Sequence, residues 1–150
     1  MITQNRWQHI LGVARQAKAL AQKLKPENTQ YAEDMFLLGL LHDFGYEFMA
    51  ENQGHAAVGG AILQRNNYKY WAEVAQHGSA QTPMNDELYL LNCADMTTGP
   101  TGENFTMQER LDEIGLRHGQ NSAAYIKTKE EIKILQQDKR YTLIFSTDTL

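Results

Sequence analysis

Three residues with metal-binding side chains stand where a helical pattern calls for apolar ones. His42 and Asp43 are adjacent and directly follow the apolar run 35–41, so both are expected to be at least partly buried. Asp95 lies four residues after Leu91, on the apolar face of another predicted helix. A buried polar group without a partner costs roughly 1 to 3 kcal/mol, and an unpaired carboxylate costs more. These side chains therefore need a common partner.

A divalent cation is the simplest partner, because it offsets the carboxylates and uses the imidazole lone pairs. His9 extends the set: it lies four residues before Val13 at the edge of an apolar stripe, so its ring can also point inward. Mixed imidazole and carboxylate ligands suit Mn, Fe, Co, Ni or Zn better than Ca or Mg. The pattern predicts a transition-metal site formed by His9, His42, Asp43 and Asp95.

The elements that must position these residues are predicted to be helices. Apolar residues recur at helical spacing, Pro26 ends the first stretch, and Gly78 suits the position just after a helix. Thr106 and Glu109 form a capping-box pattern. The predicted helices span 4–24, from 28 or 29 to 41, 54–63, 68–76, 85–96, 106–118 and 121–138.

These elements predict an all-α fold, a single-domain compact bundle of about six to seven helices over residues 1–150. Its core spans about 4–118, followed by the C-terminal helix 121–138 and a tail over 139–150. Only the segment Tyr141 to Phe145, in the tail, has the composition of a strand.

Composition and charge exclude several classes of function. A length of 150 residues suits one domain, and a net charge of -4 gives no positive field for nucleic acid. The longest apolar stretch is far shorter than the roughly 20 residues of a membrane span. The single cysteine, Cys93, cannot form an intrachain disulfide and suits the core of a cytoplasmic protein. The oligomeric state stays open.

Three sequence motifs resemble a known family. The segments Arg-Trp-Gln-His9-Ile-Leu-Gly-Val, Leu-Leu-His42-Asp43-Phe-Gly-Tyr and Cys-Ala-Asp95 are similar to the H, HD and D motifs of the HD-domain superfamily of metal-dependent phosphohydrolases. The resemblance extends from the first helix to about His118. It implies that the same four residues bind one divalent metal.

Two further histidines extend the resemblance to the two-metal branch of this family. His55, in Gly-His-Ala-Ala, and His77, in Ala-Gln-His-Gly, lie between the His-Asp pair and Asp95. The resemblance implies that they hold a second ion and that Asp43 bridges the two ions. Each histidine also has a local interpretation, His55 as a cap near a helix start and His77 as a partner of a helix C-terminus.

The hypothesis for function is phosphoester hydrolysis by metal-activated water, with Asp43 orienting the nucleophile. Arg110 follows the Gly-rich loop 97–104 and could bind the phosphate of the substrate, although a surface salt bridge with Glu109 or in the turn of Glu113 would explain it equally well. The loop lacks the Gly-Lys-Ser/Thr ending of a P-loop, and a lid over the substrate is one role for it. His118 has only a helix-end interpretation.

The substrate expected for this hypothesis is a small nucleotide or another phosphorylated metabolite, since the chain is acidic. Two rival functions share the same ligands. One is a di-iron HD-type oxygenase, and the other is a non-catalytic regulatory module that binds metal or nucleotide. The sequence does not separate these alternatives.

Overall fold

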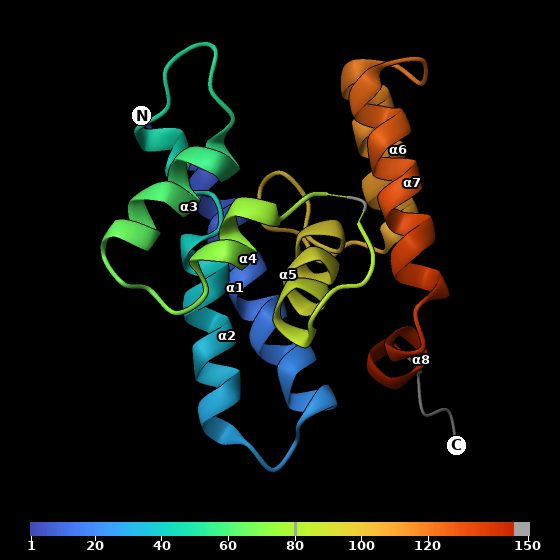
Figure 1. The fold of residues 1–150 in the computed structure, drawn as a ribbon. Coiled ribbons are helices and arrows are strands. Elements are labelled where there is room, and N and C mark those ends of the chain that lie inside the picture. The colour runs from blue at the N-terminus through green and yellow to red at the C-terminus, as the bar shows by residue number, and fades with distance from the viewer. Residues whose placement is uncertain (80, 146–150) are drawn as a thin grey trace.

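A computed structural model describes residues 1–79 and 81–145 (Figure 1). Within these residues the chain forms eight α-helices and one short 3-10 helix, and no strand is present. The all-α prediction is therefore confirmed. The helices are α1 (Gln4–Leu24), α2 (Thr29–Leu41), the 3-10 helix η1 (Phe44–Glu47), α3 (His55–Arg65), α4 (Trp71–Gln76), α5 (Asp86–Met96), α6 (Met107–His118), α7 (Ala123–Gln137) and α8 (Arg140–Phe145).

Helices α1 and α2 form a hairpin whose two arms lie side by side (Figure 1). The Thr3 side chain caps α1 and the Asn28 side chain caps α2, as expected for polar residues at these positions. The helices pack closely because Gly39 has no side chain: a Cβ there would lie 2.5 Å from the Cα of Ala14. This close approach brings the histidine of α1 near the end of α2.

We expect Gly39→Ala to destabilise the fold by about 1 to 3 kcal/mol, since the added methyl group meets the α1 backbone and not a movable side chain. Urea unfolding of the variant and the wild type measures this difference. Gly54→Ala is the matched control, because a Cβ at Gly54 would meet no atom of the described residues within 4 Å. Equal unfolding midpoints for Gly39→Ala and Gly54→Ala would contradict this packing.

Helix α5 lies at the centre of the fold and contacts α1, α2, α4 and α7. Every residue from Leu88 to Met96 is buried, including Cys93. Asp95 is thus buried because α5 is enclosed on all sides, not because it occupies one apolar face. The apolar run 35–41 predicts that this part of α2 is buried on every side, and this prediction is wrong, because Leu37 is 46% exposed.

The Gly-rich loop after α5 is fixed against α1. Thr98 and Asn104 form an isolated bridge, and Gly102 adopts a φ of 89° where it lies against the backbone of Gln8. A Cβ on Gly12 would lie 2.9 Å from the Cα of Gly102. The loop is therefore packed as part of the wall beside α1.

The C-terminal helices lie on one side of the molecule, with α6 and α7 side by side (Figure 1). The predicted strand over Tyr141 to Phe145 is wrong, since these residues belong to α8. Ile144 is fully buried, and the Tyr141 and Phe145 rings lie 4.9 Å apart at i, i+4 spacing, which favours a helix. The end of the tail, residues 146–150, lies outside the described residues. Among the described helices, none is long and apolar enough to span a membrane.

Candidate metal centre

The structure brings together all six residues predicted as metal ligands, from five different elements. His9 comes from α1, His55 from the first turn of α3, and Asp95 from α5. The remaining three flank helix ends: His42 and Asp43 follow α2 and His77 follows α4. His55 alone is partly exposed, with 29% of its side chain accessible, and the other five residues are buried. A buried cluster of imidazoles and carboxylates results.

Asp43 lies between two sets of histidines. Its Oδ2 atom is 3.4 Å from His42 Nε2 and 3.8 Å from His9 Nε2. Its Oδ1 atom is 3.2 Å from both His55 Nε2 and His77 Nε2. The two carboxylate oxygens of one residue therefore face two different groups of ligands.

Asp95 completes the first of these groups. Its Oδ1 atom lies 3.0 Å from His9 Nε2 and 3.8 Å from His42 Nε2. His9, His42 and Asp95 can each offer one ligand atom within 4.8 Å of the others, and the same is true of His42, Asp43 and His77. Such buried His/Asp groups could hold a metal ion.

The backbone fixes the orientation of three of the histidine rings. His9 Nδ1 lies 2.9 Å from the carbonyl oxygen of Gly99, in the loop packed on α1. His42 Nδ1 and His77 Nδ1 lie 2.7 Å and 2.6 Å from carbonyl oxygens three residues earlier in the chain. A carbonyl only accepts, so each Nδ1 donates a hydrogen bond to it and each Nε2 is directed at the cluster, where a bound cation would take the place of any proton on Nε2. Metal-binding histidines use this arrangement.

Two residues that lie within the quoted motif segments, but were not predicted to belong to the site, hold the fourth ring and the central carboxylate. The Tyr46 ring stacks on His55 with centroids 4.1 Å apart and an interplanar angle of 10°. The Arg6 guanidinium lies 4.1 Å from the centre of the Tyr46 ring and donates a hydrogen bond of 3.0 Å to Asp43 Oδ2. Arg6 precedes His9 by three residues on α1, a spacing that places the two side chains on one face.

The electrostatics of the cluster favour ionised carboxylates. Burial alone would raise the pKa values of Asp43 and Asp95, but the adjacent histidines outweigh it and hold both pKa values well below the ordinary value. Burial would lower the pKa of His42, yet Asp43 and Asp95 raise it to about 9.

Among the described residues, His42 Nε2 is buried without a hydrogen-bond partner. A cation in the cluster would displace the proton from this nitrogen, bind its lone pair and offset both negative charges. The donor set therefore fits a divalent transition metal.

The cluster opens into a cavity of about 550 Å³. Arg110 lines this cavity and also forms a salt bridge with Glu113. Its position is therefore compatible both with phosphate binding and with a structural salt bridge. Arg117 and His118, at the end of α6, line the same cavity, and the sequence motifs assigned neither to the site. Arg117 follows Arg110 by seven residues, which puts both on one face of α6.

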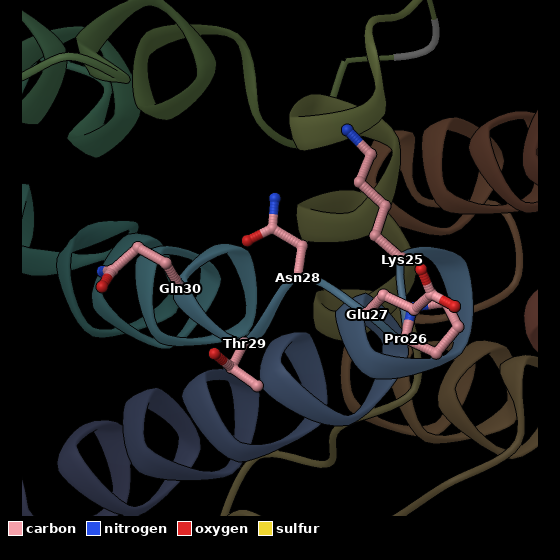
Figure 2. A pocket seen from close by; sticks show the side chains of 6 residues that line it. All are labelled: Lys25, Pro26, Glu27, Asn28, Thr29 and Gln30. Atoms are coloured by element: carbon pink, nitrogen blue, oxygen red, sulfur yellow. The ribbon is translucent and has the colours of Figure 1, made fainter.

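A second hollow lies at the turn between α1 and α2 and has a different character. It is lined by Lys25, Pro26, Glu27, Asn28, Thr29 and Gln30, whose polar ends point in different directions (Figure 2). Two of these polar groups already have structural roles: Asn28 caps α2, and the Lys25 ammonium lies 3.4 Å from Asp86. This hollow contains no convergent set of functional groups.

The chain is similar to a known protein family. A family model described as the HDOD domain matches residues 1–82, which is more than half of the 150 residues. The matched segment includes His9, His42, Asp43, His55 and His77 and stops before α5. No curated protein and no solved structure matches the chain.

Proposed function

Because the chain belongs to the HDOD domain family, which is related to the HD domains, we propose that it is an HD-type metal-dependent phosphohydrolase. HDOD proteins are often non-catalytic, so family membership alone does not supply an activity. The observation that carries the proposal is the position of Asp43, whose two oxygens face two separate groups of histidine nitrogens. A carboxylate placed in this way suits a bridge between two metal ions.

The proposed ligands divide into two sets. His9, His42, Asp95 and Asp43 Oδ2 would hold one ion, and His55, His77 and Asp43 Oδ1 would hold the other. Metal ions bound there would polarise a phosphoryl oxygen and lower the pKa of bound water toward 7. The protein contributes fixed ligand orientation, through the Nδ1 hydrogen bonds of three histidines and the stacking of His55 on Tyr46.

The surroundings of the cluster support a small phosphorylated substrate. A cavity of about 550 Å³ is within the usual range for small-molecule sites. Arg110 contributes a positive charge to its wall, and a guanidinium can bind two phosphate oxygens at once. A small phosphorylated metabolite, including a nucleotide, therefore fits this site better than a polymer would, because the chain carries a net charge of -4.

Hydrolysis of a panel of phosphomonoesters and phosphodiesters tests the proposal directly. We expect release of phosphate or alcohol from at least one substrate with Mn²⁺ or Fe²⁺, and loss of this activity with a chelator. The same assay without oxygen should give the same rate, which would exclude the oxygenase alternative. Stable metal binding without turnover of any substrate would instead favour a non-catalytic module, the alternative that the family itself suggests.

Metal removal should also lower the thermal stability of the protein. A ligand present at 100 times its dissociation constant stabilises the folded state by about 2.7 kcal/mol, which corresponds to roughly 5 to 10 °C in Tm for a chain of this size. Differential scanning fluorimetry with chelator, and then with added Mn²⁺, measures the shift. Ca²⁺ is the control, because it prefers oxygen ligands and should restore less stability. A Tm that neither chelator nor Mn²⁺ changes would argue against a metal centre.

A further inference from the structure

Helix α6 presents a row of charged side chains to the cavity beside the histidine cluster. Arg110, Glu113 and Arg117 are spaced at i, i+3 and i+7, and all three line the cavity that His9, Asp43 and Asp95 also line. None of the three belongs to the proposed metal ligands. Their side chains form a separate wall of the same site.

One carboxylate in this row is shared by two guanidinium groups. Arg110 Nη1 lies 2.9 Å from Glu113 Oε2, and Arg117 Nε lies 3.0 Å from Glu113 Oε1. Two positive charges and one negative charge leave an excess of one positive charge on this wall. Glu113 therefore holds both arginines in place without neutralising them.

The burial of Arg110 shows that this wall differs from an ordinary surface ion pair. Its side chain is only 9% exposed, and within the described part of the chain its Nε atom has no hydrogen-bond partner. Burying a guanidinium with an unused donor is costly, so an anionic ligand would improve its environment. Arg117 is 46% exposed and can reach toward the same ligand from solvent.

We propose that Arg110 and Arg117 form a subsite for a second phosphate group of the substrate, distinct from the phosphate that is hydrolysed at the metal centre. Glu113 is the positioning residue of this subsite. The inference rests on the proposed function and narrows its substrate class to compounds that carry at least two phosphate groups. Arg6 has a different role, since its guanidinium is already bonded to Asp43 and placed over Tyr46.

The test compares a monophosphonate with diphosphonates, which resist hydrolysis. Isothermal titration calorimetry on the Mn²⁺-loaded protein would measure binding of methylphosphonate and of a series of diphosphonates with one to four methylene groups between the phosphorus atoms. We expect at least one diphosphonate to bind more tightly than methylphosphonate. Arg117→Gln and Arg110→Lys should each reduce this advantage by about fivefold or more, the loss expected from a charge-assisted hydrogen bond, and Arg117→Gln should leave methylphosphonate binding unchanged.

The control variant is Arg65→Gln, which changes an exposed arginine at the end of α3 that does not line the cavity. Arg65→Gln should bind the diphosphonate more tightly than methylphosphonate by the same factor as the wild type. The proposal is overturned if no diphosphonate binds more tightly than methylphosphonate, or if the advantage survives in both variants, as simple chelation of the metal would predict. In either case, if the metal-loaded protein still binds methylphosphonate, the proposed function is not contradicted. Metal-loaded protein that binds no phosphonate at all would overturn both proposals.

Discussion

Replacing Asp43 with asparagine should abolish hydrolysis and remove metal from the protein. The asparagine side chain would keep one oxygen, but it would lose the negative charge and place an amide NH₂ group near one of the two histidine sets. Changes in the outer shell of a metal site cost about 10- to 100-fold in affinity or activity. Loss of a carboxylate that faces both sets should cost more, and we expect a decrease in kcat/KM of about 1000-fold or more together with lower metal content.

Asp112→Asn is the matched control for this experiment. Asp112 is an exposed aspartate on α6 whose carboxylate accepts a hydrogen bond from Gln108 and does not line the cavity of the metal centre. It should retain wild-type activity and metal content. Full activity in Asp43→Asn would show that this carboxylate is not needed for the reaction.

Replacing Glu131 with glutamine should stabilise the fold at neutral pH. Glu131 lies on α7, is 2% exposed, and its Oε2 atom has no hydrogen-bond partner among the described residues. Burial, with a further contribution from the Asp95 carboxylate, raises the pKa of Glu131 to about 8, and the opposing charges of Lys127 and Arg110 do not cancel this effect. The charged form is therefore unfavourable in the folded state.

The sign of the pH dependence follows from this raised pKa. Below the ordinary pKa of 4.5 the Glu131 carboxyl is protonated in both the folded and the unfolded state, so it does not lower the free energy of unfolding. The loss of folding stability caused by this carboxyl grows as pH rises from 4.5 to about 8 and is constant above that. At pH 7 the difference corresponds to about 3 kcal/mol, at about 1.36 kcal/mol per pKa unit. Glu131→Gln should gain this stability at pH 7 and little at pH 4.5.

Urea unfolding at several pH values, with chelator present, measures this difference. Glu130→Gln is the control, since Glu130 is the exposed neighbour on the same helix and should show no such pH-dependent gain. A gain for Glu131→Gln that is the same at pH 4.5 and pH 7 would indicate that the charge of Glu131 is not its cause.

The sequence was sufficient to predict the all-α fold and to select six residues that the structure brings together, and their role as metal ligands stays a prediction. The boundaries of α1 were predicted correctly because a strong apolar repeat starts near Gln4 and Pro26 ends it. The burial of His42 and Asp95 was predicted from the apolar run 35–41 and from the spacing of Asp95 to Leu91, and the cost of burying polar groups then indicated that they need a partner. The sequence did not indicate that Leu37 would be exposed or that α5 would be enclosed on all sides, because both depend on how the helices pack.

Other features arise only from the tertiary structure. The contacts of Arg6 with Tyr46 and Asp43 join residues about 40 positions apart, which no local spacing predicts. The sharing of Glu113 between two arginines depends on which face of α6 lines the cavity. Residues 141–145 have a strand-like composition, yet they form a helix because Ile144 packs into the core.

The measurement that tests the two-metal centre most directly is the metal content per chain, determined by plasma mass spectrometry on protein purified without chelator or nickel. The wild type should contain two ions, and the variant with both His55→Ala and His77→Ala should contain one, held by His9, His42, Asp43 and Asp95. One ion in both proteins would restrict the centre to those four residues and contradict a bridging role for Asp43, and no ion in either would contradict the metal centre itself.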